Sequence, residues 1–265
     1  MSNYRVIAFL FASILVISAN SNAATYRLGV PPVMSQAEST QRYNALLHYL
    51  GNKTGHRFEL VTSSNFMGYW QSMRKPDVFD FLIDGAHLAA YRVERRHHSF
   101  VARLDGVVSY SLIGRGEDLI IDPEELLNRT IAILPSPNMS AIAMAKIFNN
   151  PSHQPRQVVM TNAEEALDAV RSKKVDAAIV PTSFLPRYPG ASVILTTEQM
   201  PGLTMTASAD VPQDVVVKVQ EALVQAYNEP EGKQALDQLQ FVKFIAVSPR
   251  DYQGLGQLLE GLWGY

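Results

Sequence analysis

The sequence predicts an α/β protein of two lobes, each a mostly parallel sheet flanked by helices, with two hinge crossings between them. Short apolar runs alternate with amphipathic stretches along the chain, which is the pattern of βαβ units. The last predicted helices have no strand among them, so we expect them to return to the first lobe and cover its sheet. A chain of 265 residues, 47% of them apolar, is long enough for two modest cores.

The first lobe is predicted from three successive pairs of a strand and a helix. Apolar residues recur at helical spacing in the first helix, and Gly55 follows its end. Ser63, Ser64 or Asn65 is available as the N-cap of the second helix. The strands are expected at 26–32, 58–62 and 79–83, and the helices at 36–53, 65–73 and 86–96.

The second half of the chain repeats this alternation. Strands are expected at 107–115, 130–134, 157–161, 176–180, 192–197 and 203–208, with helices at 123–128, 141–148 and 163–173 between them. Closing helices are expected at 213–227, 232–239 and 249–263. We therefore expect residues 24–106 and 207–265 in the first lobe and 107–206 in the second, with crossings near 105–109 and 204–209.

Composition excludes several classes of protein. The chain has no cysteine, so it has no disulfide framework and no cysteine-based zinc or iron–sulfur site. Lys and Arg number 23 against 25 Asp and Glu, and a net charge of −2 gives no reason to expect a nucleic acid or an acidic membrane as partner. We expect no cofactor.

The N-terminus has the form of a secretory signal peptide. Arg5 precedes an apolar stretch from Val6 to Ile17, which is shorter than the roughly 20 residues that span a bilayer. Small residues at Ser21 and Ala23 suit a signal peptidase, so we expect residues 1–23 to be removed. An uncleaved anchor or a buried helix is the alternative. A lipoprotein is excluded because no cysteine can carry the lipid, and we expect an exported, periplasmic protein.

Polar side chains gather where predicted strands end, the usual place for ligands in open α/β sheets. Backbone N–H groups at the following helix starts favour an oxyanion, and hydroxyl, amide and imidazole groups can donate to it as well. Asp84 can orient His87 or bind a ligand ammonium, and His87 can make affinity depend on pH. The candidate ligand-binding residues are Ser64, Asn65, Asp84, His87, Ser136, Asn138, Ser140 and Thr182, with Ser63 and Ser183 beside them.

These residues also have purely structural interpretations. Asn138 or Ser140 can simply cap a helix, and a single histidine at a helix start is often a structural residue. The basic tract 92–98 is expected to be a solvated helix face, because cations there complement the helix dipole. Tyr69 and Trp70 are expected in the core rather than on a ligand. No histidine spacing suits a metal ion.

An ordered set of motifs resembles the type II periplasmic solute-binding proteins of ABC transporters, and within them the phosphate, phosphite and phosphonate branch. The resemblance implies a two-lobed clamp that closes on a small solute, here a small oxyanion or organic phosphonate, and delivers it to an inner-membrane permease. The motifs are Leu28-Gly-Val-Pro31, the Tyr43 to Gly55 helix, Val78-Phe-Asp-Phe-Leu-Ile-Asp-Gly-Ala-His87, Val175-Asp-Ala-Ala178, Asn228-Glu-Pro-Glu-Gly-Lys233 and Val247-Ser-x-x-x-Tyr252.

The resemblance also implies where the ligand binds. In the phosphonate branch a Ser-Thr-Ser-Gly loop holds the anion, and the matching residues here are Asn138-Met139-Ser140-Ala141. A tyrosine expected at the start of the second helix falls on Phe66, which cannot donate a hydrogen bond, and another falls near Ala89. The usual phosphonate is therefore not assured as the ligand.

A periplasmic sensor and a hydrolytic enzyme are the alternatives to a transport protein. A periplasmic sensor that signals to a membrane kinase or receptor would have the same cleft, so sequence does not separate it from a transport protein. A hydrolytic enzyme is disfavoured, because the chain lacks a Gly-x-Ser-x-Gly elbow, a Walker loop, a dinucleotide fingerprint and a cysteine nucleophile. We expect a monomeric binding protein and no enzyme.

Overall fold

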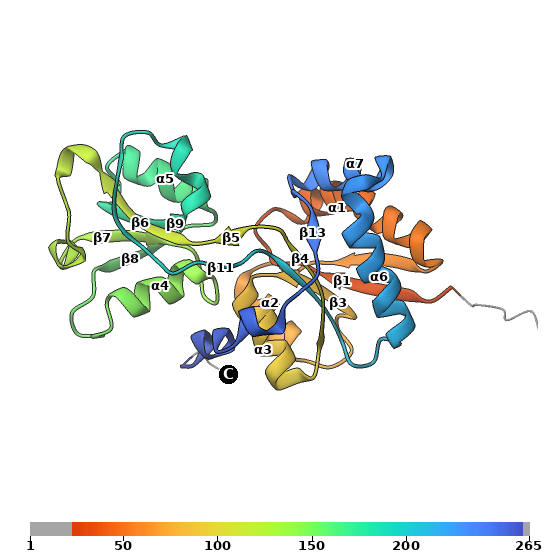
Figure 1. Cartoon of the computed structure of the whole chain (residues 1–265). Helices are drawn as coiled ribbons and strands as arrows, with labels where there is room; N and C mark the ends of the chain where they lie inside the picture. The colour runs from red at the N-terminus through yellow and green to blue at the C-terminus, as the bar shows by residue number, and fades with distance from the viewer. Residues whose placement is uncertain (1–22, 262–265) are drawn as a thin grey trace, which may run out of the picture.

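The structure, a computed structural model, describes residues 23–261 and shows two lobes side by side (Figure 1). The first lobe is built on a six-stranded sheet with strand order β13-β4-β12-β3-β1-β2. The second is built on a five-stranded sheet with the order β10-β6-β9-β7-β8. Each sheet has helices packed against it, so the predicted α/β architecture of two lobes is confirmed. The sheets were expected to be mostly parallel, but both mix parallel and antiparallel pairs, because the chain returns to each sheet through antiparallel strands.

In the first lobe β1 lies parallel to β2 and β3, and the returning strand β12 lies antiparallel to β3 and β4. The residues after each of the parallel strands therefore share one edge of the sheet. The elements are β1 (Thr25–Gly29), α1 (Gln36–Thr54), β2 (Arg57–Val61), α2 (Phe66–Met73), β3 (Phe81–Asp84), α3 (Ala86–Arg96), β4 (Ser99–Leu104), β12 (Thr204–Ala207), α6 (Gln213–Gln225), α7 (Pro230–Leu239) and β13 (Phe244–Ile245).

Local capping explains where the first helices begin and end. The Ser35 side chain accepts a hydrogen bond from the Glu38 N–H at the start of α1, and Gly55 ends that helix with a positive φ of 76°. Asn65 is the N-cap of α2, its side chain accepting from the Gly68 N–H at 2.8 Å. Of the three predicted caps, the structure therefore selects Asn65.

The closing helices return to the first lobe as predicted. Tyr49 of α1 donates its hydroxyl hydrogen to the carbonyl oxygen of Ala222 in α6, at 2.8 Å. Apolar residues of α1, α6 and α7 share one buried core with strands β1, β3 and β4. Burial of this shared apolar surface contributes about 25 cal/mol per Å². It holds the C-terminal helices on a sheet whose strands β1, β3 and β4 come from the first part of the sequence.

The second lobe has the same parallel arrangement at its centre. Strand β7 lies parallel to β8 and β9, and β6 lies antiparallel between β9 and β10. The elements are β6 (Tyr110–Arg115), the 3-10 turn η2 (Pro123–Leu126), β7 (Thr130–Ile133), α4 (Met139–Ile147), β8 (Arg156–Val159), α5 (Ala163–Arg171), β9 (Ala177–Pro181), the 3-10 turn η3 (Thr182–Arg187) and β10 (Ala191–Thr196).

Two short strands connect the lobes. β5 (Val107–Val108) and β11 (Met200–Pro201) pair antiparallel between the two sheets (Figure 1). The predicted strand 107–115 is thus divided into β5 and β6, which belong to different sheets. The chain joins the first sheet again at Thr204, ahead of the boundary expected at residue 207.

The C-terminal segment differs from its prediction. The helix expected at 249–263 is replaced by two 3-10 turns, η5 (Pro249–Tyr252) and η6 (Leu255–Leu259). Gly254 separates them with a positive φ of 76°, a conformation that interrupts a helix. The end of the predicted helix and nearly all of the predicted signal peptide lie outside the described residues. Within residues 23–261, no helix combines the length and apolarity needed to cross a membrane.

Candidate functional site

The predicted site loops follow strands whose carboxyl ends point toward the other lobe. In the first lobe, β2 leads into α2 and β3 leads into α3. In the second lobe, β7 leads into α4 and β9 leads into η3. The start of α3 meets the loop before α4, because an imidazole nitrogen of His87, Nε2, lies 3.1 Å from the carbonyl oxygen of Pro137. The structure thus brings together the two loops expected to converge on a ligand.

His87 is the central residue of this contact between lobes. It is only 4% exposed, and its Nε2 faces a carbonyl, so that nitrogen carries the hydrogen and donates it. Its Nδ1 is buried without a hydrogen-bond partner. Burial lowers the pKa of His87, so the ring is neutral near pH 7. A Cβ on Gly85 would come within 2.9 Å of Nδ1, so a larger residue there would force the ring to shift.

Asp84 has a structural role in this arrangement. Its carboxylate is fully buried and accepts two hydrogen bonds from the Arg92 guanidinium, at 2.6 and 2.7 Å. The Tyr69 hydroxyl donates to the same carboxylate, and Arg92 Nε donates to the Thr206 hydroxyl at 3.0 Å. All of these groups are hydrogen-bonded to one another within the first lobe, so Asp84 is not placed to contact a ligand.

The prediction that the basic tract 92–98 is a solvated face was wrong for Arg92. Arg92 is 0% exposed, whereas Arg95, Arg96 and His97 are exposed. The reason is tertiary: α3 turns Arg92 toward the sheet, where Asp84 and Thr206 satisfy its donors. Tyr69 and Trp70 are buried, as predicted, with 0% and 2% of their surface exposed.

The loop before α4 is held by its own side chains. The Ser140 hydroxyl donates to the carbonyl oxygen of Ile179 at 2.7 Å and accepts from the Leu134 N–H at 3.1 Å. Ser140 is fully buried, so its hydroxyl fastens α4 to β7 and β9. The Asn138 side chain accepts from the Ser140 N–H at 2.9 Å, as a helix cap does.

Sequence reasoning missed Tyr110, the first residue of β6, which lies close to the Asn138 side chain. Burial raises the pKa of Tyr110 to about 12, so the phenol stays protonated at neutral pH. The only signal in the sequence was an aromatic residue just after a crossing. Ser136, two residues before Asn138, is partly buried.

Thr182 lies in a cluster of hydroxyl groups at the same edge of the second sheet. Its hydroxyl oxygen accepts from the Ser109 hydroxyl at 2.9 Å and lies 2.9 Å from the Ser111 hydroxyl. Ser111 in turn lies 3.0 Å from the Thr196 hydroxyl. Together these groups link β6, β9 and β10 near the crossing, and Ser183 beside them is exposed.

The loop before α2 stands apart from this contact. Ser64 and Asn65 are exposed and hydrogen-bonded to each other at 3.3 Å, with Ser63 partly buried beside them. Phe66 is 5% exposed and lies in the core of the first lobe. Nothing in the described part of the chain places these residues in contact with His87 or the Asn138 loop.

Apolar side chains surround the meeting point of the lobes. Met139 and Ile142 of α4 belong to the same buried cluster as Tyr69 and Leu88 of the first lobe. Met200 of the hinge strand β11 is also part of this cluster. Most of the interlobe surface is therefore apolar, and hydrogen-bonding groups are concentrated at His87 and the loop before α4.

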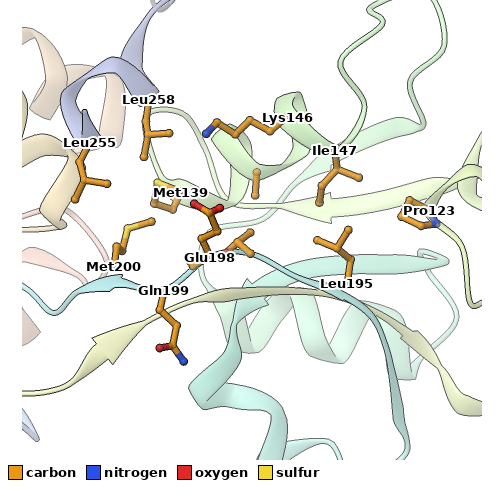
Figure 2. A pocket seen from close by; sticks show the side chains of 12 residues that line it. Pro123, Met139, Lys146, Ile147, Leu195, Glu198, Gln199, Met200, Leu255 and Leu258 are labelled. Atoms are coloured by element: carbon orange, nitrogen blue, oxygen red, sulfur yellow. Dashed lines mark hydrogen bonds between the residues drawn. The ribbon is translucent and has the colours of Figure 1, made fainter. Parts of the chain in front are cut away.

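A cavity of about 550 Å³ runs along α4 and past Met139 (Figure 2). The second lobe, the hinge strand and the C-terminal turn η6 all contribute to its walls. Across residues 23–261, no group of three acidic or histidine side chains is placed to hold a metal ion. The cavity is lined by Pro123, Met139, Ala143, Lys146, Ile147, Leu195, Thr197, Glu198, Gln199, Met200, Leu255 and Leu258.

Comparison with solved structures shows the same fold in proteins of low sequence identity. The XAC2383 protein of Xanthomonas citri, solved with ATP, is 14% identical, covers 89% of this chain and 96% of its own, and has a TM-score of 0.75. PhnD1 of Prochlorococcus marinus, solved with methylphosphonate, is 12% identical, with coverage of 89% and 97% and a TM-score of 0.74. The binding component PA3383 of an ABC phosphonate transporter of Pseudomonas aeruginosa is 20% identical, with coverage of 89% and 86% and a TM-score of 0.73.

A family match identifies the group of proteins. No curated protein sequence matches the chain. Residues 28–252 match the sequence model of the family described as "ABC transporter, phosphonate, periplasmic substrate-binding protein". This match confirms the resemblance seen in the motifs, and the fold agrees with it. The chain therefore belongs to the phosphonate-binding periplasmic substrate-binding proteins of ABC transporters, a family of solute-binding transport proteins.

Proposed function

We propose that this chain binds the phosphonate group of its ligand between His87 and the loop 136–138, at the N-terminus of α4. The observation that carries the proposal is the hydrogen bond from His87 to Pro137, which joins the two lobes at the end of β3 and the start of α4. Methylphosphonate is bound by PhnD1, which has the same fold. The helix dipole favours an anion at this helix start.

The hydrogen bond to Pro137 indicates how a ligand enters. The His87 N–H donates to a neutral carbonyl oxygen 3.1 Å away. When the lobes part, that donor is released, and a phosphonate oxygen replaces the carbonyl as its acceptor. A charged acceptor makes a hydrogen bond roughly twice as strong as a neutral one. The ligand thus stabilises the closed form more than the contact between the lobes does alone.

The protonation state of His87 suits the same ligand. The ring is neutral at pH 7, and its Nε2 carries the hydrogen. A phosphonate oxygen can accept that hydrogen. On the opposite loop, the Asn138 side chain accepts from the Ser140 N–H and so holds the start of α4 in place.

The remaining parts of the function follow the family. We propose that residues 1–23 direct export and are removed, and that the chain acts as a periplasmic monomer without a lipid anchor or enzymatic activity. The hinge strands β5 and β11 allow the lobes to open and close. The closed, loaded form is the one delivered to an inner-membrane ABC permease.

Calorimetry with methylphosphonate tests this proposal. We expect His87→Ala to weaken binding at least tenfold, which corresponds to about 1.4 kcal/mol, because the ligand loses its imidazole contacts. His48→Ala is the matched control, since His48 is exposed on α1 in the same lobe. Equal affinities for His87→Ala and the wild-type protein would overturn the assignment of this site.

A further inference from the structure

The apolar cavity beside the proposed headgroup site has no role in binding a small phosphonate. Its volume of about 550 Å³ falls within the roughly 300–1,000 Å³ of typical ligand pockets, and it is far larger than a methyl group requires. Met139 is the first residue of α4 and lines the cavity, while its neighbour Asn138 lies in the loop proposed to bind the headgroup. A ligand bound at the start of α4 therefore has the cavity directly beside it.

The walls of the cavity are mainly hydrocarbon. Figure 2 shows Leu255 and Leu258 at one end, Leu195 and Pro123 at the other, and Met139 between them. The two leucines come from η6, which lies beyond residues 28–252 that match the family. This part of the wall is therefore supplied by the C-terminal segment.

That C-terminal wall is firmly seated. Leu259 is 0% exposed in the interlobe cluster, and a Cβ on Gly256 would lie 3.3 Å from the Tyr91 Cα of α3. Tyr252, just before the segment, places its hydroxyl 2.6 Å from the Thr204 hydroxyl of β12. The turn η6 therefore forms a fixed wall against α3.

The charges at the cavity balance each other. Lys146 lies on the α4 side and Glu198 on the opposite strand segment, and both side chains are exposed (Figure 2). One cation and one anion leave the cavity with no net charge to attract a second ionic group. The cavity can then prefer one ligand substituent over another only through the apolar surface that the substituent buries.

We propose that the cavity holds the apolar substituent of the ligand, so that this protein selects phosphonates with an extended alkyl group. The inference rests on the proposed function, because the phosphonate group itself is bound at the start of α4. The substituent enters past Met139 and lies between α4 and the wall formed by Leu195, Leu255 and Leu258. Each buried methylene group strengthens binding about fourfold.

Calorimetry with methylphosphonate and hexylphosphonate tests the proposal, because the two ligands share one headgroup. We expect hexylphosphonate to bind the wild-type protein at least tenfold more tightly. Glu198→Trp places a large ring in the cavity, toward which the Glu198 side chain points (Figure 2). We expect this variant to lose the preference for hexylphosphonate while its affinity for methylphosphonate stays within about twofold. Glu221→Trp, an equal change on the exposed outer side of α6, is expected to retain the preference.

The outcomes separate this inference from the proposed function. Equal binding of both phosphonates by the wild-type protein would overturn the cavity assignment and leave the headgroup site standing. A preference for hexylphosphonate that survives in Glu198→Trp would also overturn it, since the alkyl chain would then lie elsewhere. Failure of both phosphonates to bind the wild-type protein would overturn the proposed function, and this inference with it.

Discussion

Two histidines of this protein each have a ring nitrogen that is buried. The Nδ1 atoms of His87 and His98 are both buried without a hydrogen-bond partner. Burial lowers the pKa of each, and for His98, which also lies near Arg92 and Arg96, the pKa falls to about 3. Both rings are therefore neutral in the folded chain at pH values where they would be protonated in the unfolded chain.

This difference predicts a loss of stability in mild acid. Below pH 6.5 the unfolded chain binds a proton at His98 that the folded chain excludes, so the free energy of unfolding decreases as the pH falls. We expect the contribution of His98 to this slope to grow from about 0.7 kcal/mol per pH unit at pH 6.5 toward about 1.4 kcal/mol per pH unit at pH 5. Urea unfolding at several pH values measures the slope. His98→Gln should make it shallower, whereas His48→Ala, which alters an exposed histidine, should leave it unchanged.

At the scale of secondary-structure elements, a buried ion pair connects four parts of the first lobe. Asp84 at the end of β3 binds Arg92 of α3, and these two residues also bind Tyr69 of α2 and Thr206 of β12. His87 lies in the first turn of α3, directly after β3. The ion pair therefore fixes the first-lobe half of the proposed site without touching the ligand.

Removing one partner of this pair should destabilise the protein strongly. We expect Asp84→Asn to lower the free energy of unfolding by about 3–5 kcal/mol, because it leaves the Arg92 charge buried and unpaired. The same change in an Arg92→Met background should cost much less, as urea unfolding of all four proteins would show. Asp80→Asn is the matched control, since Asp80 pairs with the partly exposed Arg27. Equal costs of Asp84→Asn in both backgrounds would contradict this coupling.

Sequence predicted those elements whose signals are local. The boundaries at Gly55 and Asn65 depend on neighbours a few residues away, and the structure retains both. Strand β4 was missed because it follows directly on the basic tract 92–98. Whether a polar side chain is free for a ligand depends on partners that are distant in the sequence. The Ser140 hydroxyl donates to the carbonyl oxygen of Ile179, and Arg92 donates to the hydroxyl of Thr206. The loops of the site could be predicted, but the state of each side chain in them could not.

At the scale of the whole molecule, the two lobes are in contact. The contact combines the hydrogen bond from His87 to Pro137 with an apolar cluster that includes Met139 and Ile142. These contacts must part to admit a ligand, and the bound ligand must stabilise the closed form further. We infer that packing between the lobes sets how often the cleft opens.

A charge placed in this cluster should open the ligand-free protein. Ile142 is 6% exposed, so Ile142→Glu would bury an unpaired carboxylate unless the lobes separate. We expect small-angle X-ray scattering to show a larger radius of gyration for this variant than for the wild-type protein. Ala145→Glu, on the exposed side of the same helix, should leave the radius unchanged. A folded Ile142→Glu protein with the wild-type radius would show that this cluster does not hold the lobes together.

The proposed function requires a phosphonate group to replace the contact between His87 and Pro137 at the start of α4. A crystal structure of the chain with methylphosphonate would show whether it does. We expect a phosphonate oxygen within hydrogen-bond distance of His87, next to the start of α4, with the hydrogen bond from His87 to Pro137 broken. A phosphonate bound elsewhere while that hydrogen bond persists would rule this site out.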